Sequence, residues 1–510
     1  MGFFTEDLYC HIVENKKDYL KYASIFPVAI VLVIFISYYP LVLGKSIQNE
    51  TWYGDSRYSL FVKVPSYWKD LRSWVESHSP NTRLLAFPRN YYGMTYNWES
   101  GASFAGPAVV PLLPNPIIMH PPRVPTSEQN RMASLIYQSL YLGEGTIFFP
   151  YLDLFNIGYV LQQNDASFYN EAGVFDPLIM NKILGNQNYL KKEAGFGRLE
   201  FISQDKGGEK IETDALTIFS VQRNNSRKFA YSPKELIFVS GRLEDYWDIF
   251  SFSQYHSEKA YYFSDDQSQE IDQESLSPSR VFVNLKTSLE GKNEDGGYTY
   301  KFSVPLTSSF KLLVNNYLLG KQAGDNSKTY YLRLDGNHLN ELSSIGGWQG
   351  AGPLLLTEGT HVLETNLLVE IIKSEYITSP FWIVEEKEVP QYEGLKLLSE
   401  KINPAKYKIE ISNYKDDFVL ILNESFHWEW KVYYKNQRLD LYHFLANGYA
   451  NGWILPKDKF GENEKINLEI RYYPQEVAQK AAMVSVSFIF VIIAYLTIDL
   501  LGALVKKKEL

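Results

Sequence analysis

The sequence has almost no cysteine and no excess of positive charge. Cys10 is the sole cysteine among 510 residues, so the rest of the chain can form no internal disulfide. A large disulfide-free region outside the cytoplasm is unusual for an animal secreted protein but ordinary for a prokaryotic surface protein. The formal net charge is −9 and no basic stripe is visible. Because binding a polyanion needs such a stripe, we expect no nucleic-acid partner.

Short catalytic and metal-binding motifs are also missing. The eight histidines form no HExxH or similar pattern, and the sequence contains no G-x-S-x-G elbow, P-loop or G-x-G-x-x-G. Asp265 and Asp266 follow an aromatic strand pattern, where adjacent side chains point to opposite faces and cannot easily converge on one ion. The sequence therefore predicts no self-contained catalytic site, no metal site and no cofactor.

Aromatic residues and two long apolar segments are what the sequence has instead. Aromatic residues make up 15% of the chain, and they favour β structure because their side chains suit a pleated, half-buried surface. The apolar segments run from Ile25 to Leu43 and from Ala481 to Val505, each long enough to cross a hydrocarbon core of about 30 Å. A cleaved signal peptide is the alternative for the first segment. Its leader is long and mixed in charge, and no small-x-small site follows, so we interpret it as an uncleaved anchor.

Lysine clusters flank both apolar segments and predict the topology. Lys16, Lys17 and Lys21 precede the first segment, and 506–508 are three lysines that follow the second. Positive charge near a membrane helix marks its cytoplasmic end. We therefore expect a two-pass protein of the cell membrane, with the lipid bilayer as a partner. Both termini would be cytoplasmic and the large domain extracytoplasmic.

Local patterns between the apolar segments predict an α+β multidomain fold. A mixed α/β domain is followed by antiparallel β-sandwich domains of jelly-roll type, because short strands recur about every ten residues. The expected division is a cytoplasmic stub over 1–24, a transmembrane helix over 25–43, a mixed α/β outer domain over 45–225, connecting strands, a helix and an acidic linker over 226–279, a β-sandwich over 280–390, a β-rich domain over 391–478, a transmembrane helix over 481–505 and a cytoplasmic tail over 506–510.

Several elements of the first domain can be placed from the sequence. The helical spacing of Trp68, Leu71 and Val75 predicts a helix after Pro65. Apolar runs at 83–88 and 155–165 predict buried strands, and two alternating segments at 197–205 and 215–222 predict a hairpin pair. The proline-rich stretch at 107–125 predicts an extended loop, with no regular helix or inner strand.

Three aromatic segments are candidates for contacts with a glycan, because aromatic rings can stack on a sugar while nearby polar groups bond its hydroxyls. Each also has a structural explanation. Asn-Gly turns account for every residue of the last segment, a buried sandwich corner explains the middle one, and a solvated surface glutamate explains the first. The candidates are Trp98 and Glu99 in YNWESG, Trp348 in SIGGWQGAGP, and Asn447, Tyr449, Asn451 and Trp453 in HFLANGYANGW.

The order of these motifs resembles the carboxy-terminal extracytoplasmic part of polytopic glycosyltransferases of GT-C type, notably α-(1→3)-arabinofuranosyltransferase-like proteins. The resemblance rests on VPSYWKDLRSWV, RLLAFPRNYYGMTYNWESG, NIGYVLQQND, HFLANGYANGW and LEIRYYPQ. It implies carbohydrate-binding-like sandwich domains outside the cytoplasm, including the one over 280–390. In that family a bundle of amino-terminal helices uses a polyprenyl-phosphate sugar donor, and an acidic residue in an early outer loop carries out catalysis.

This sequence departs from the family pattern because it has one apolar helix before the outer region. No catalytic residue can therefore be carried over, although Trp98, Glu99, Asn447, Tyr449, Asn451 and Trp453 match recurring motif positions. We expect an accessory region that handles a cell-envelope polysaccharide, with a separate polytopic glycosyltransferase subunit supplying the chemistry. One alternative is a structural or interaction scaffold in an envelope complex. Another is an enzyme whose site is assembled only in the fold.

Overall fold

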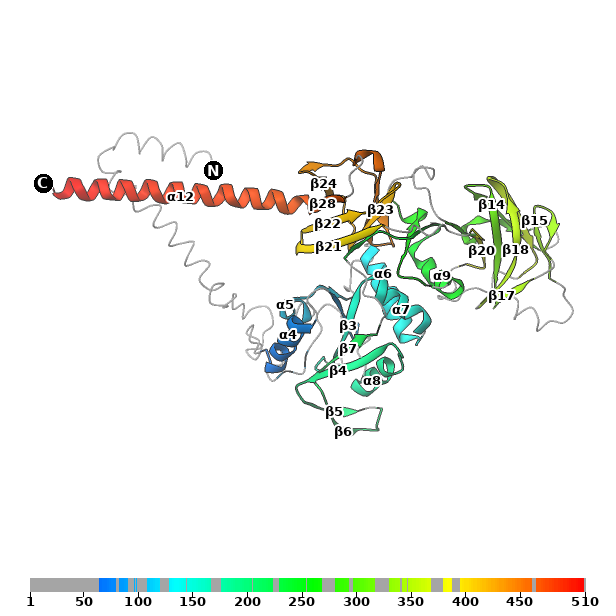
Figure 1. Cartoon of the computed structure of the whole chain (residues 1–510). Coiled ribbons are helices and arrows are strands. Elements are labelled where there is room, and N and C mark those ends of the chain that lie inside the picture. The colour runs from blue at the N-terminus through cyan, green and yellow to red at the C-terminus, as the bar shows by residue number, and fades with distance from the viewer. Residues whose placement is uncertain are drawn as a thin grey trace, which may run out of the picture. The chain divides into compact units, whose positions relative to one another are not determined.

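The computed structural model describes residues 64–508 apart from 79–81, 90–95, 97, 99–107, 120–127, 144, 167–175, 204, 223–228, 254, 268–279, 293–296, 317–329, 340–341, 346, 368–378, 388–394 and 461–464. These residues belong to two compact units. One comprises 65–96 and 103–472, and holds all the sheets; the described part of the other is dominated by one long helix. Figure 1 labels the elements along the chain.

The first sheet combines parallel and antiparallel strands. Its order is β2 (Ile117–Ile118), β1 (Arg83–Phe87), β3 (Ile157–Gln163), β7 (Leu216–Val221) and β4 (Leu190–Phe196). Strand β1 is parallel to both neighbours, whereas β7 is antiparallel to β3 and β4. The same domain contains helices α4 (Ser66–His78), α6 (Glu128–Tyr141), α7 (Gly145–Leu154) and α8 (Pro177–Gly185).

Helix α4 confirms the helix predicted after Pro65. It buries Trp68, Leu71 and Val75 on one face, while its other residues are half-buried or exposed. Strand β1 is buried along its whole length, and β3 is buried at most positions, as the apolar runs predict. Apolar residues at helical spacing lie on one face of a helix and are buried together. The local sequence pattern was therefore sufficient to predict this helix.

Two predictions for this domain were wrong. The segment around β5 (Leu199–Ser203) does not pair with β7; it pairs with β6 (Glu209–Thr213), through a turn where Gly207 and Gly208 have positive φ. Glycine adopts that backbone conformation without steric cost, so the turn decides the partner. The proline-rich stretch also contains a one-turn helix, α5 (Val109–Leu112), while β2 occupies the sheet edge, where proline-rich segments are tolerated.

The middle sandwich is built from a seven-stranded and a five-stranded sheet. The larger sheet has the order β10 (Lys259–Phe263), β9 (Glu235–Ser240), β11 (Arg280–Asn284), β20 (Phe381–Glu385), β14 (Ser308–Asn315), β18 (Trp348–Leu356) and β17 (Ser343–Ile345). Strands β9 and β10, expected in a connecting segment, thus extend this sheet as a parallel pair joined through η1 (Leu243–Asp245) and α9 (Tyr246–Phe252). The smaller sheet has the order β12 (Leu289–Lys292), β13 (Tyr298–Val304), β19 (Gly359–Thr365), β15 (Leu332–Leu334) and β16 (Asn337–His338).

The last sandwich has a separate core between two antiparallel sheets. One sheet has the order β21 (Lys396–Asn403), β22 (Lys406–Ser412), β28 (Lys465–Tyr472), β24 (Trp430–Tyr434) and β25 (Gln437–Arg438). The other has the order β26 (His443–Ala446), β27 (Ala450–Leu455), β23 (Phe418–Ser425) and β8 (Ala230–Tyr231). Alternate residues of β22 and β28 are buried, so one face of their sheet packs inward and the other remains open.

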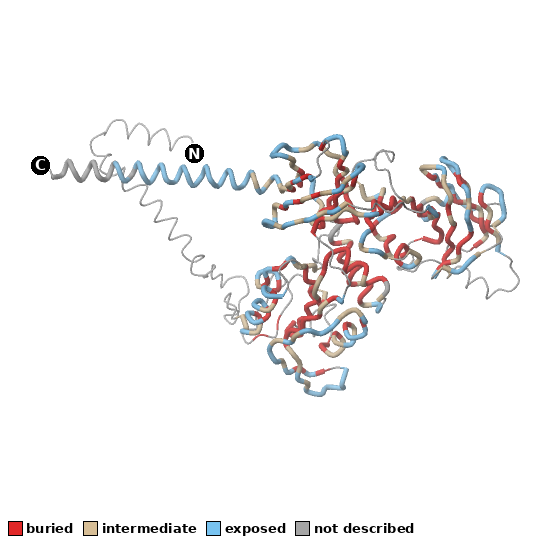
Figure 2. The backbone as a smooth tube through the Cα atoms, in the orientation of Figure 1, coloured by how far each residue is buried: buried red, intermediate tan, exposed pale blue. Residues whose placement is uncertain are grey.

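Strand β28 continues directly into helix α12 (Tyr473–Lys508), which has 36 residues. Within it, Tyr473–Tyr495 is long and apolar enough to cross a membrane. Figure 2 shows α12 exposed beyond its first turn, in contrast to the many buried strand residues of the sheets. The apolar segment over 25–43 lies outside the described residues.

Candidate functional site

Trp348 lies inside the middle sandwich and not in an open binding loop. Its side chain is 1% exposed at the start of β18. The indole Nε1 donates to Ser251 Oγ at 2.7 Å, and the ring packs edge-on against Phe252 at 5.6 Å between centroids. The residue therefore anchors α9 to the larger sheet of this sandwich.

The HFLANGYANGW segment forms the hairpin of β26 and β27, and Asn447 and Gly448 occupy its turn with positive φ. Asn447 Oδ1 accepts from Tyr261 N at 3.0 Å, and Nδ2 donates to Tyr231 Oη at 2.9 Å. Tyr449 stacks on Phe155 with centroids 4.0 Å apart. The turn thus joins three parts of the fold.

Asn451 and Trp453, on β27 of the same hairpin, are also buried and make internal contacts. Asn451 Nδ2 donates to the carbonyl oxygens of Glu424 and Ser425, so its Oδ1 faces His443 Nε2 at 3.1 Å and accepts from it. Trp453 stacks on the His443 ring at 4.6 Å. Burial lowers the pKa of His443 to about 4, which keeps this imidazole neutral near pH 7.

These positions support the structural explanation of the motifs. Trp98, Trp348, Asn447, Tyr449, Asn451 and Trp453 are each at most 5% exposed. A ring that is covered on both faces offers no stacking surface to a sugar arriving from solvent. Glu99 lies outside the described residues, and its role stays a prediction.

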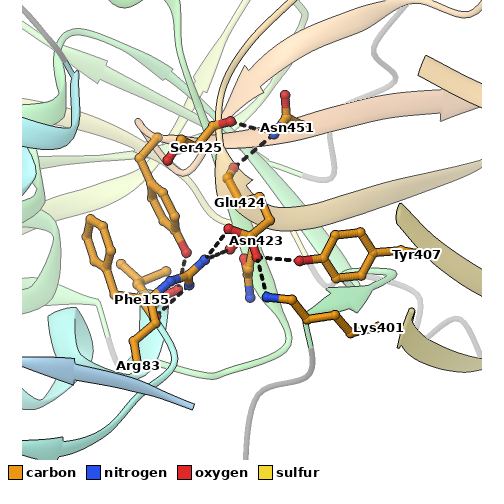
Figure 3. Close-up of polar contacts among 10 residues, drawn as sticks. Arg83, Phe155, Lys401, Tyr407, Asn423, Glu424, Ser425 and Asn451 are labelled. Carbon is orange, nitrogen blue, oxygen red and sulfur yellow. Dashed lines mark hydrogen bonds and ion pairs between the residues drawn. The ribbon is translucent and has the colours of Figure 1, made fainter. Parts of the chain in front are cut away.

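A buried ionic cluster joins the first domain to the last sandwich, and no sequence motif predicted it. Arg83 on β1 donates through Nη1 to Phe155 O at 2.8 Å and through Nη2 to Asn423 O and, at 3.0 Å, to Glu424 Oε2 (Figure 3). The Arg83 side chain is 5% exposed and that of Glu424 17%. We call Arg83, Glu424, Lys401 and Tyr407 the Arg83–Glu424 cluster.

The remaining members of this cluster hold Glu424 from the other side. Tyr407 Oη donates to Glu424 Oε1, and Lys401 Nζ lies 3.4 Å from the same oxygen (Figure 3). Burial alone would raise the pKa of Glu424, but the positive charges of Arg83 and Lys401 outweigh it and lower the pKa below 4.5. The carboxylate is therefore charged and fully bonded, as expected for a structural clamp.

In the part of the chain that the structure describes, a groove of about 540 Å³ lies on the outward face of the sheet formed by β21, β22, β28 and β24. Sequence reasoning missed it, although the polar alternation of β22 and β28 was a signal. One row of side chains crosses its floor, since Glu400 pairs with Lys408, Lys408 with Glu469, and Glu469 with Tyr433. The groove is lined by Leu398, Ser399, Glu400, Lys408, Ile409, Glu410, Tyr433, Lys435, Asn436, Asn467, Leu468 and Glu469.

Ion pairs hold the Glu469 carboxylate in this groove. Glu469 Oε2 bonds Arg471 Nε at 2.8 Å and Lys406 Nζ at 3.0 Å. Burial alone would raise the pKa of Glu469, but these two partners lower it, so the carboxylate is charged near neutral pH. The Arg471 guanidinium lies 4.5 Å from the ring centre of Tyr433. The groove thus offers carboxylates, two amides and a phenol, which suits hydrogen bonding to hydroxyl groups.

Comparison with known proteins places the fold. A family model described as "Alpha-(1->3)-arabinofuranosyltransferase, N-terminal GT-C domain" matches residues 12–283, more than half of the chain. No curated protein matches. Two cryo-EM structures of a point mutant of arabinofuranosyltransferase AftD from Mycobacteria share the fold. The first has a TM-score of 0.54 and 10% identity, and the match covers 86% of this chain and 66% of that one.

The second mutant structure has a TM-score of 0.52 and 9% identity, covering 85% of this chain and 65% of that one. A further AftD structure has a TM-score of 0.49 and 9% identity, and the match covers 80% of this chain and 62% of that one. This chain therefore spans less than two thirds of the length of these AftD chains. At such low identity the likeness shows the fold alone, and the family follows from the family model. The chain belongs to the GT-C family of α-(1→3)-arabinofuranosyltransferases.

Proposed function

We propose that this chain is an extracytoplasmic accessory region of a cell-envelope arabinofuranosyltransferase and that it holds the acceptor glycan. The observation that carries the proposal is the groove on β21, β22, β28 and β24. Four adjacent strands span roughly 14 Å across their hydrogen-bonding direction. That width suits an oligosaccharide segment better than a single sugar.

The charges in the groove favour a neutral glycan over a charged polymer. Acidic residues Glu400, Glu410 and Glu469 share the lining with Lys408 and Lys435, so neither sign dominates. A charged polymer would meet repulsion along part of its length, whereas sugar hydroxyls can both donate and accept. Tyr433 and Leu398 add apolar surface for the faces of the sugar rings.

In this proposal the sugar transfer itself takes place on a separate polytopic subunit. Transfer from a lipid-linked donor needs a carboxylate beside the acceptor hydroxyl and a membrane-facing site for the donor phosphate. The Glu469 carboxylate is ion-paired with Lys406 and Arg471, and its lowered pKa makes it a poor base. Glu99 remains the predicted position at which we would look for a catalytic carboxylate on this chain.

A structural scaffold in an envelope complex is the second candidate function. The observation in its favour is the burial of Trp348, Asn447, Tyr449 and Trp453, each at most 2% exposed. These residues were the sequence-based candidates for glycan contact, and their contacts are internal. A scaffold would bind no glycan in the groove either.

Binding of a neutral arabinofuranose oligosaccharide to the full-length chain in detergent separates the two functions. We expect saturation-transfer NMR signals from the sugar and about tenfold weaker binding for Tyr433→Ala, a loss of roughly 1.4 kcal/mol. Tyr330→Ala is the matched control, because Tyr330 is 46% exposed and lies outside the groove. Equal affinity of both variants, or no binding at all, would favour the scaffold.

A further inference from the structure

Two loops of the last sandwich lie at the end of the sheet from which α12 continues. Trp430 at the start of β24 pairs with Tyr472, the last residue of β28. The backbone N–H of Tyr472 donates to Ala405 O at 2.9 Å, in the turn between β21 and β22. The His427 ring, in the loop between β23 and β24, is 5.3 Å from the Tyr472 ring. We call this end of the sheet, with its two loops, the helix-side edge.

The helix-side edge exposes one apolar side chain near the end of β21 and one in the loop between β23 and β24. Ile402 is 42% exposed and Trp428 is 40% exposed. Trp428 is the one exposed tryptophan among those that the structure describes. The chain then passes to Tyr473, which is 46% exposed at the first position of α12. These exposed aromatic and aliphatic side chains would be removed from water only by an apolar or amphipathic partner.

Basic side chains lie near these apolar residues. Lys431 Nζ, on β24, donates to Trp428 O at 2.5 Å. In the next row of the sheet, Lys406 pairs with Arg471, and Arg471 pairs with Lys431; Lys406 and Arg471 are both ion-paired with Glu469. A lysine beside a tryptophan, here Lys431 beside Trp428, is a combination found at membrane interfaces, where the ring lies among the headgroups and the cation reaches phosphate.

The length of α12 brings the helix-side edge to the height of the headgroups. A helix of 36 residues is about 54 Å long. Tilts of about 20–40° shorten its projection along the membrane normal to roughly 51–41 Å. A bilayer with its headgroups is about 40–45 Å thick. If the lysines at 506–508 lie at the inner headgroups, Tyr473 emerges at or slightly above the outer ones.

We propose that the helix-side edge docks on the phospholipid headgroup layer of the membrane that α12 crosses, with Trp428 and Ile402 as its contact points. Chain continuity argues for this partner, because Tyr472 in the edge is bonded directly to the first residue of the helix. Docking would fix the groove relative to the membrane. Glu469 precedes Tyr472 by three residues, or about 10 Å of extended strand.

The test measures the depth of single side chains in a bilayer with the full-length chain. Cys10→Ser supplies a cysteine-free background, into which Trp428→Cys and Ile402→Cys are introduced separately and spin-labelled. Leu355→Cys is the water-exposed control, since Leu355 is 79% exposed on β18, and Val484→Cys within α12 is the membrane control. The proteins are reconstituted in phosphatidylcholine and phosphatidylglycerol in equal parts. Collision rates with oxygen and with a water-soluble nickel complex are compared.

We expect labels at 402 and 428 to collide several-fold less often with nickel than the label at 355, and more often with oxygen. Their values should lie between those of the two controls. Nickel access equal to that at 355 would overturn the proposal. Low access to both reagents would overturn it too, because it would indicate a protein partner. Two positions on different segments, β21 and the loop between β23 and β24, keep the test decisive if one variant does not fold.

Discussion

At the scale of single residues, Arg83 shows what a buried charge needs in order to be stable. Its guanidinium is 5% exposed and lies beside a carboxylate and two backbone carbonyl oxygens. Desolvating an ion pair costs several kcal/mol per ion, and only good geometry with additional hydrogen bonds offsets that cost. Removing one partner therefore harms more than the pair itself stabilises.

We predict that Arg83→Met lowers the free energy of unfolding by about 2–4 kcal/mol, because it leaves Glu424 largely buried with Lys401 as its nearest cation. Glu424→Gln should cost less, about 1–2 kcal/mol, since an amide still accepts from Tyr407. Arg72→Met is the matched control, because Arg72 and Glu76 form an exposed i,i+4 pair. That change should cost under about 0.5 kcal/mol. Denaturant unfolding in detergent measures all three.

The same variants should differ in their sensitivity to acid. The pKa of Glu424 is below 4.5 in the folded chain, so the unfolded chain binds this proton first. Its contribution to stability is fully present above about pH 5 and is lost as the pH falls through the folded-state pKa. Glu424→Gln should lose less stability on acidification than the parent chain. Identical acid profiles and equal losses for Arg83→Met and Arg72→Met would contradict this account.

At the scale of elements, the β26–β27 hairpin shows how a turn can join distant parts of a fold. Its turn residue Gly448 has a φ of +70°. A Cβ atom at this position would lie 2.4 Å from Leu243 Cδ1 on η1. Glycine is therefore needed both for the backbone conformation and for the close approach of the two elements.

We predict that Gly448→Ala lowers the free energy of unfolding by about 2–4 kcal/mol, the sum of left-handed strain and overpacking. Gly336→Ala separates these two effects. Gly336 has a φ of +80°, but nothing lies within 4 Å of the added Cβ. The control should cost about 1 kcal/mol from strain alone. Similar losses of stability for the two variants would show that contact with Leu243 is unimportant.

At the scale of the whole molecule, the topology predicted from the lysine clusters concerns how the sheets lie relative to the membrane. If the lysines at both ends of the chain are cytoplasmic, as we predict, residues 45–478 should face outward. In intact cells we predict that Cys10 resists a membrane-impermeant maleimide. A cysteine at position 355 in the Cys10→Ser background should react, because Leu355 is 79% exposed.

Permeabilised cells supply the control for the topology measurement. Cys10 should become reactive once the membrane is opened, which shows that it was sheltered by the bilayer and not by the fold. Labelling of Cys10 in intact cells would invert the predicted orientation. It would also place the groove on the cytoplasmic side, away from an envelope glycan.

Local periodicity predicted many elements correctly and failed where a choice of partner was involved. The buried stripe of α4 and the buried strand β1 follow from side chains a few residues apart. Both β6 and β7 were possible partners for β5. The glycine turn between β5 and β6 decided in favour of β6. Alternation is the same in any partner strand, so it cannot choose among them.

The sequence by itself determined the family, the predominance of β structure and the presence of a long apolar segment in α12. Each of these depends on the order of residues or on residues close together in the chain. Only the tertiary structure decided which aromatic residues are buried. Trp348 is covered by Ser251 and Phe252, and Tyr449 by Phe155, partners that are remote in the chain. The groove likewise exists only after four strands pair side by side. Exposure is a property of surfaces brought together over long separations, and no local pattern records it.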